Sequence, residues 1–128
     1  MAVNNDSMVF VIQNPTIKDR PAFDFTPAEK FGPVEILLPN GKDVLTPDIF
    51  IEQVRRRLDE VEFDPYHDYL VAVGSPPVNL VLGALLAEFG RFTVLHWINS
   101  AKQYQPITYD INQPQSRRDH ARANALGR

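Results

Sequence analysis

The stretch Tyr69-Leu-Val-Ala-Val73, with the Gly74-Ser-Pro-Pro77 segment that follows it, decides the fold that this sequence predicts. Five consecutive apolar residues are typical of a strand that is buried on both faces in the middle of a parallel sheet. Glycine and two prolines then predict a turn into a second apolar segment, a helix over about residues 78–89 that ends at Gly90. We therefore expect a strand, a turn and a helix at the centre of the domain.

Further elements on both sides of this unit predict an alternating pattern of strands and helices. Val34-Glu-Ile-Leu-Leu38 is a candidate strand. Thr46-Pro-Asp48 predicts the start of a helix to about Val61, because Thr can cap a helix, Pro suits its first turn and Asp favours its positive end. Residues 92–98 and 104–111 are rich in β-branched and aromatic residues and predict two antiparallel strands.

The order of these elements predicts the fold class, α/β. We expect a single small domain with a mostly parallel β-α-β-α-β sheet and a C-terminal antiparallel edge hairpin, since Pro106 suits an edge strand. Right-handed crossovers would place the three parallel strands side by side, with both helices on one face of the sheet. The other face then needs a cover, which the N-terminal arm, the C-terminal segment or a second subunit must supply.

The first part of the chain is a short strand followed by a proline-rich arm. Met8-Val-Phe-Val-Ile12 is the strand, and the prolines that recur after it prevent long regular elements. A solvated linker would not need Phe23, Phe25 and Phe31, so we expect the arm to pack on the domain or on a partner. The predicted organisation is a strand with its packed arm in residues 1–33, an α/β core in 34–111 and a basic tail in 112–128.

The composition is that of a globular protein. The chain has 128 residues, of which 44% are hydrophobic, and it is long enough to bury a core without staples. It contains no cysteine, which excludes disulfides and thiolate metal sites. The N-terminal residues are polar, unlike a signal peptide, and no apolar run approaches the roughly 20 residues that span a bilayer. We expect a cytoplasmic protein that has no membrane contact and no cofactor.

The charges are divided unevenly along the chain. Residues 1–111 carry 9 Lys and Arg against 15 Asp and Glu, a formal charge of −6, whereas residues 112–128 carry +3. A basic tail on an acidic body suggests a separate role for the tail. If the protein contacts nucleic acid, the sequence offers this tail alone for it, through Arg117, Arg118 and Arg122. A solvated terminus is the simpler interpretation.

The turn after the central strand is a candidate ligand site. The carboxyl ends of strands in open α/β sheets are where ligands usually bind, and helix N-termini attract anions. Gly74, Ser75 and Asn79 are the residues that would contribute. The glycines and the lysine of known phosphate-binding loops are absent, however, and two prolines remove backbone donors. A rigid turn capped by Ser75 is the alternative.

The second helix is a candidate interface, because it is apolar nearly all round. Asn79, Gly83 and Ala87 recur every four residues along it, and close approach of another backbone would explain a glycine in mid-helix. Packing on the chain's own sheet is the alternative to a homo-oligomer contact. The predicted interface residues are Asn79, Gly83 and Ala87 of the helix, and Phe23, Phe25 and Phe31 of the arm.

Catalytic and metal-binding patterns are weak. Asp64, His67 and Asp68 could ligate a metal, but no further ligand stands at a familiar spacing, and a polar loop explains them. Ser75 and His96 could form part of a nucleophile triad, yet the sequence around Ser75 departs from the Gly-x-Ser-x-Gly pattern. We therefore predict no catalytic residues and no metal ligands.

Three segments resemble a group of small uncharacterised α/β proteins encoded by bacterial viruses. The segments are Asp68-Tyr-Leu-Val-Ala-Val-Gly-Ser-Pro-Pro, Gly90-Arg-Phe-Thr-Val-Leu-His-Trp and Tyr104-Gln-Pro-Ile-Thr-Tyr-Asp-Ile. Members of the group read Asp-Tyr-Leu-Leu-x-Ile-Gly-Asp-Pro, a helix, and Gly-Arg-x-Lys-Leu-Leu-x-Trp-Asp. The resemblance covers residues 68–111, with Ser75 in place of Asp and with Ile98-Asn99 outside the Trp-Asp pattern. It implies a viral origin, the host cytoplasm as the compartment, and no particular chemistry.

These observations favour a binding protein over an enzyme. We expect a non-enzymatic accessory protein of the bacteriophage type, which binds a host or viral protein and could inhibit it, for example by covering a basic surface. The alternative is a protein that binds a small, nucleotide-like ligand at the turn formed by residues 74–77. A hydrolase that uses His67 or Ser75 is the third hypothesis.

Overall fold

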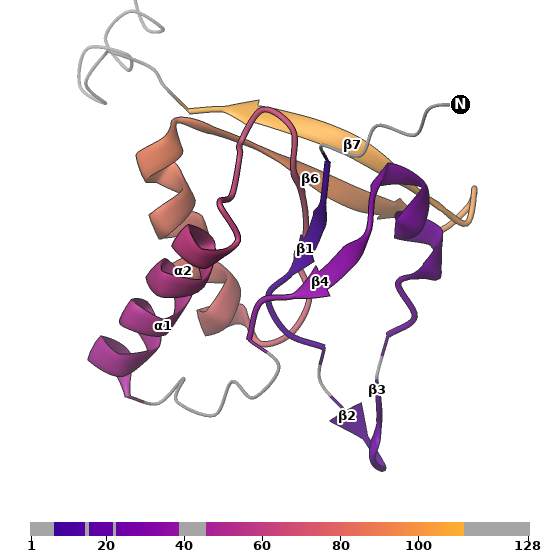
Figure 1. Cartoon of the computed structure of the whole chain (residues 1–128). Coiled ribbons are helices and arrows are strands. Elements are labelled where there is room, and N and C mark those ends of the chain that lie inside the picture. The colour runs from indigo at the N-terminus through magenta and orange to yellow at the C-terminus, as the bar shows by residue number, and fades with distance from the viewer. Residues whose placement is uncertain (1–6, 15, 22, 39–45, 112–128) are drawn as a thin grey trace, which may run out of the picture.

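The computed structural model describes residues 7–14, 16–21, 23–38 and 46–111 (Figure 1). The strands are β1 (Val9–Val11), β2 (Thr16–Ile17), β3 (Arg20–Pro21), β4 (Val34–Ile36), β5 (Tyr69–Val71), β6 (Arg91–Ile98) and β7 (Gln103–Asp110). The helical segments are η1 (Thr26–Phe31), α1 (Pro47–Glu60), α2 (Pro76–Leu86) and η3 (Ala87–Phe89). Within the described part of the chain, no helix has the length together with the apolar character that crossing a bilayer requires.

Five strands form one sheet in the order β4-β1-β5-β6-β7. The pairs β4–β1, β1–β5 and β5–β6 are parallel, and β6 and β7 form an antiparallel hairpin whose second strand is at the edge. The predicted α/β class, the mostly parallel sheet and the C-terminal edge hairpin are therefore confirmed. The hairpin pairs residues from Arg91 with Asp110 to Ile98 with Gln103, so it is the longest part of the sheet.

β1 lies inside the sheet, and the predicted strand order was wrong in leaving it out. It pairs with β4 on one side and β5 on the other, so β4 and β5 are not side by side. The physical reason is burial. Val9–Val11 are at most 1% exposed, and a strand covered on both faces satisfies its backbone only with a neighbour on each edge. The expectation that residues 69–73 include a central strand is confirmed, because β5 lies between β1 and β6.

The helices α1 and α2 lie together on one face of the sheet, as predicted (Figure 1). Their inward side chains meet alternate residues of the strands, such as Phe10 and Leu70, in one apolar core. Burial of each such side chain stabilises the fold by about 1.5–3 kcal/mol. The helix residues buried in this core are Phe50, Val54 and Leu58 of α1, and Val78, Leu82, Leu85 and Leu86 of α2.

The arm covers the opposite face of the sheet. Phe25 and Ala28, the latter within η1, pack against Val11, Val71 and Leu95 from three strands. Figure 1 shows η1 across the sheet from α1 and α2. Of the three covers considered from the sequence, the structure describes the N-terminal arm in this position. The result is a three-layer arrangement of helices, sheet and arm.

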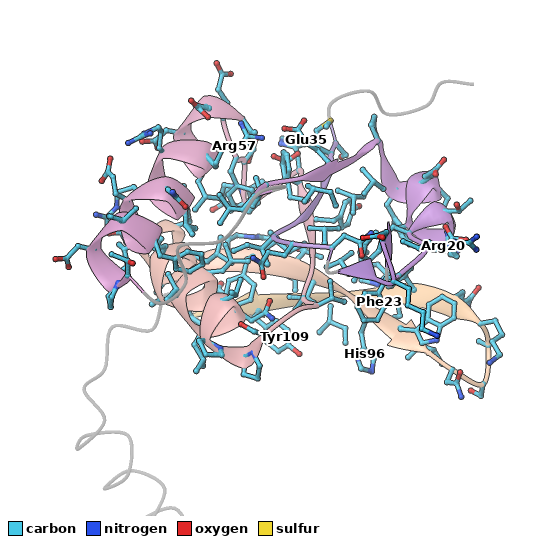
Figure 2. The ribbon with its side chains drawn as sticks, turned by 90° about the horizontal axis from the view of Figure 1, so that it is seen from below. Arg20, Phe23, Glu35, Arg57, His96 and Tyr109 are labelled. Carbon is cyan, nitrogen blue, oxygen red and sulfur yellow. The ribbon has the colours of Figure 1, made fainter. Side chains whose placement is uncertain are left out.

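An ion pair joins α1 to the sheet. Arg57 of α1 donates from Nη2 to Glu35 Oε2 of β4 at 2.8 Å and from Nε to the Leu37 carbonyl at 2.7 Å (Figure 2). The cap expected at Thr46 is wrong, because its side chain makes no capping hydrogen bond with the described residues. Pro47 in the first helical position is the part of the predicted start that the structure retains.

Candidate functional site

The sheet opens at its carboxyl edge because β5 ends before its neighbour does. The last residue pair between these strands joins Leu70 to Val94. β5 ends at Val71, whereas β6 continues to Ile98. The chain also leaves β1 toward β4 on one side and leaves β5 toward β6 on the other. The topological switch point of the sheet therefore lies between β1 and β5. The opening lies beside it, at the carboxyl ends of β5 and β6, and α/β proteins usually bind ligands at this edge of the sheet.

A pocket of about 460 Å³ occupies this opening, a size within the range of roughly 300–1,000 Å³ for small-ligand sites. Its lining comes from parts of the chain that are far apart in sequence. The lining residues are Phe23 and Asp24 of the arm, residues 71–73 after and within β5, residues 94–97 of β6, and Tyr104 of β7. Figure 2 labels two of these residues, Phe23 on the arm and His96 on β6.

Aromatic rings form much of the wall of this pocket. Trp97 and Tyr104 are paired across the β6–β7 hairpin, with ring centroids 5.0 Å apart and ring planes at 67°. Phe23 approaches from the arm, and its ring lies 6.1 Å from that of the buried Phe25. Phe23 and Trp97 are 46% and 38% exposed, so they present apolar surface to solvent at the pocket.

Asn14, just after β1, holds Phe23 in this position. The Nδ2 atom of Asn14 donates to the carbonyl oxygen of Phe23 at 3.1 Å. The Oδ1 atom of Asn14 accepts from the backbone N–H of Phe23 at 3.3 Å. One side-chain amide therefore satisfies both backbone groups of a residue in an irregular segment. The arm wall of the pocket is thus ordered before any ligand arrives.

Asp24 supplies a negative charge to the pocket. Its Oδ1 atom accepts from the Thr26 hydroxyl at 2.6 Å and from the Thr26 backbone N–H at 3.0 Å. These hydrogen bonds, the hydroxyl first, lower the pKa of Asp24, so the group is a carboxylate at neutral pH. Burial raises the pKa of Tyr104, and the charge of Asp24 raises it further. The pocket therefore combines aromatic faces, a neutral phenol and one carboxylate.

The turn that was predicted to bind a ligand lies beside this pocket. Gly74 follows Val73, a lining residue, and has a φ of 98°. The Nδ2 atom of Asn79 donates to the carbonyls of Val73 at 3.1 Å and Ser75 at 3.2 Å, so the amide holds the turn. Ser75 makes no side-chain cap to α2 with the described residues. Gly74, Ser75 and Asn79 are outside the pocket lining, whereas His96 is part of it.

The residues predicted as an interface on α2 lie toward its outer side. A Cβ at Gly83 would meet no atom of the described residues within 4 Å, so close packing there does not account for this glycine. Ala87 is exposed and Asn79 is half-buried. Leu80, in the same helix, is 74% exposed. The basic tail residues Arg117, Arg118 and Arg122 lie outside the described part of the chain.

The three phenylalanines of the arm have different surroundings. Phe25 is buried in the core beneath the arm. Phe31 is half-buried, and its ring lies 5.3 Å from that of Tyr69. Phe23 is exposed at the pocket. Two of the three therefore fasten the arm to the sheet, and the third faces the pocket.

The Asp64–Asp68 loop is held by internal hydrogen bonds. Asp68 is 5% exposed and accepts from the backbone N–H of Met8 at 3.0 Å and of Asp64 at 2.8 Å. His67 Nδ1 lies 2.7 Å from Asp64 Oδ2. The Tyr66 backbone N–H and then this His67 contact lower the pKa of Asp64. Among the described residues, no group of three or more His, Asp or Glu side chains is placed to hold a metal ion.

The charged and aromatic pocket residues that were missing from the sequence prediction are Asp24, Trp97 and Tyr104. Trp97 and Tyr104 become neighbours through the register of the β6–β7 hairpin. Asp24 joins them because the arm crosses the sheet. The aromatic residues of arm and hairpin were visible in the sequence, but their meeting depends on long-range packing.

Fold and pocket together define a small α/β protein with an aromatic, ligand-sized pocket at the carboxyl edge of a mostly parallel sheet. The chain belongs to the Phage Pam3 gp32-like protein family, whose family model matches residues 7–111. The predicted resemblance to phage-encoded proteins is thus confirmed, and the match extends beyond residues 68–111 to include β1 and the arm. No curated protein and no solved structure matches the chain.

Proposed function

We propose that this phage-family protein acts without catalysis, by binding a host or viral protein through the surface around the pocket. The exposure of Phe23 and Trp97 at the pocket carries the proposal. Large aromatic side chains are enriched among the residues that dominate binding energy at protein interfaces. Two such rings beside a concave site provide an anchoring point for a partner.

The order of the arm supports the same proposal. Asn14 fixes the backbone of Phe23, and Thr26 fixes the carboxylate of Asp24. A surface whose side chains are already in place loses less conformational entropy when a partner binds. Such a surface binds more tightly than a flexible one with the same contacts.

The side chains of the lining support binding over catalysis. His96 lines the pocket, but the lining residues of the described chain include no Ser, Thr or Cys that it could activate as a base. Nucleophilic catalysis needs a nucleophile within hydrogen-bond reach of its base. A hydrolase that uses His67 or Ser75 has less support, because neither residue lines the pocket.

Capture of a partner by matched variants tests this function. The full chain is immobilised and exposed to lysate of infected host cells, alongside Trp97→Ser and Ile49→Ser. Both substitutions remove a large, partly exposed apolar side chain, but Ile49 lies on α1, away from the pocket. We expect Trp97→Ser to lose a protein that the wild type and Ile49→Ser retain. Equal capture by all three chains would contradict the proposal.

A small-ligand protein is the second candidate, and the volume of the pocket favours it. The negative charge of Asp24 disfavours a phosphate at this site, which weakens the nucleotide-like version. Thermal shift with a nucleotide panel separates the two candidates, because a saturable rise in unfolding temperature would favour the small-ligand protein.

Association of two copies of the chain through α2 stays a prediction, which light scattering tests.

A further inference from the structure

We propose that the pocket receives an arginine side chain from a basic segment of the partner protein. This inference rests on the proposed function and specifies its chemistry. The juxtaposition that carries it is an aromatic corner, formed by Trp97 and Tyr104, with the Asp24 carboxylate and the Phe23 ring on the arm side.

The aromatic rings suit a planar cation. A guanidinium stacks on the face of an aromatic ring, and it is attracted by the negative potential of that face. Trp97 and Tyr104 already pack edge to face, with ring centroids 5.0 Å apart and ring planes at 67°, so a guanidinium would stack on ring surface that this contact leaves exposed, as on the 38% exposed Trp97. The chain already contains one such contact, because the guanidinium carbon of Arg91 lies 4.4 Å from the centre of the Tyr66 ring.

The negative charge of the Asp24 carboxylate favours a positively charged ligand. Both hydrogen bonds from Thr26 end on the Oδ1 atom of Asp24. The Oδ2 atom of Asp24 accepts no hydrogen bond from the described residues, so it is available to an N–H donor. Asp24 lines the same pocket as Trp97 and Tyr104, and its negative charge raises the pKa of Tyr104. An anion here would meet this charge without a compensating cation in the lining.

Charge over the whole body favours a basic partner. Residues 1–111 carry a formal charge of −6, and residues 7–111 are the part that the family model matches. Complementary charge speeds encounter and suppresses binding to acidic proteins. Arginine suits the pocket better than lysine because its planar group can stack and donate at once, whereas an ammonium is a compact, strongly hydrated charge.

The sole tryptophan of the chain gives a direct measurement, because Trp97 lines the pocket. Trp97 fluorescence of the full chain is titrated with N-acetyl-arginine amide, N-acetyl-lysine amide and adenosine monophosphate. We expect a saturable change with the arginine compound, a weaker response with the lysine compound and no saturable response with the nucleotide. Absence of a saturable response to the arginine compound, or tighter binding of the nucleotide, would overturn the inference.

Two variants that each remove one negative charge test whether arginine binding depends on Asp24. Asp24→Asn retains an oxygen that can accept from Thr26, so the turn is kept while the charge is lost. Because Asp24 is exposed and its charge is screened by solvent, we expect this variant to weaken arginine binding about two- to fivefold. Asp59→Asn changes the net charge equally on α1 and should leave the binding unchanged. Equal affinity of Asp24→Asn and the wild type would contradict the role of the carboxylate.

Failure of this inference is distinguishable from failure of the proposed function. If Trp97→Ser loses a captured partner but the arginine compound never binds, the surface is functional and the arginine assignment is wrong. The basic tail of the chain is the competing source of arginine. A chain that lacks residues 112–128 should therefore keep the Trp97 emission of the full chain. A large emission change on removal of the tail would assign the pocket to the tail and overturn the inference.

Discussion

Tyr104 and Asp24 are 80 positions apart in the chain, yet the charge of Asp24 affects the ionisation of Tyr104 at the pocket. Burial favours the neutral phenol of Tyr104, and the neighbouring carboxylate opposes a second negative charge, so both raise the pKa of Tyr104. We expect Asp24→Asn to lower the pKa of Tyr104 and to leave it above the ordinary value. Ultraviolet absorbance of tyrosinate during an alkaline titration measures this, with Tyr104→Phe identifying the contribution of this residue. An unchanged titration in Asp24→Asn would show that the two groups do not interact.

Gly32 stands where the arm meets the start of β1. Its φ is 150°, and a Cβ there would overlap the carbonyl oxygen of Ser7. Gly32→Ala should therefore destabilise the protein by about 2–6 kcal/mol, since strain and overpacking each cost about 1–3 kcal/mol. Denaturant unfolding measures the loss. A stability equal to that of the wild type would mean that the arm and β1 do not approach as described.

Single residues of the arm could be predicted only in part. The three phenylalanines indicated that the arm packs, because an exposed linker has no use for them, and Phe25 and Phe31 do pack. Asp24 was not predicted, since an acidic residue between two phenylalanines looks the same whether it faces solvent or a pocket. Its role follows from the path of the arm across the sheet, which no local pattern contains.

Helix α2 contains a glycine that its own fold does not require. The space beside Gly83 is open within the described chain, so alanine fits there. Because alanine is favoured over glycine in helix interiors, Gly83→Ala should stabilise the monomer by about 0.5–1 kcal/mol. Thermal or denaturant unfolding at low protein concentration provides the measurement. A destabilised monomer would show that something packs closely on Gly83, and a copy-to-copy contact would appear as weaker association in light scattering.

The loop before β5 connects two elements through one buried carboxylate. Asp68 bonds the backbone at the start of β1 and at Asp64, which ties the central strand to the loop after α1. In Asp68→Asn, the side-chain NH2 group would replace one of the two carboxylate oxygens. It would then face one of the two backbone N–H groups that now donate to Asp68, so that hydrogen bond would be lost. The expected cost is about 2–4 kcal/mol, because hydrogen bonds to charged groups contribute about 1.5–3 kcal/mol each. Asp59→Asn should stay within about 0.5 kcal/mol of wild type in the same unfolding experiment; similar losses in both variants would contradict this role.

The positions of the helices and strands in the sequence were easier to predict than the order of the strands in the sheet. Apolar runs and helix-period stripes located β5, β6, α1 and α2 to within a few residues. The position of β1 was not predicted, because strand order depends on which edges remain free after folding. A three-residue strand with an irregular connection carries no local sign of its neighbours. The pocket shares this dependence, since it exists only because β5 ends while β6 continues.

The three layers of the molecule, which are helices, sheet and arm, have different structural roles. The helices and one face of the sheet form the larger core, and the arm covers the other face. The arm stops the sheet from presenting an open apolar face, and it also supplies one wall of the pocket.

The net negative charge of residues 1–111 predicts that association with a basic partner becomes slower as the salt concentration rises, because ions screen complementary charges.

The central claim is that partners bind around the pocket and not on the outer helix faces. Site-specific photo-crosslinking tests it most directly, with a photoreactive aromatic residue placed at Phe23 in one chain and at Leu80 of α2 in another. Both positions are exposed, at 46% and 74%, so both substitutions should be tolerated. The account predicts that, in infected cells, position 23 crosslinks a specific protein that position 80 does not. A specific crosslink from position 80, with none from position 23, would contradict it.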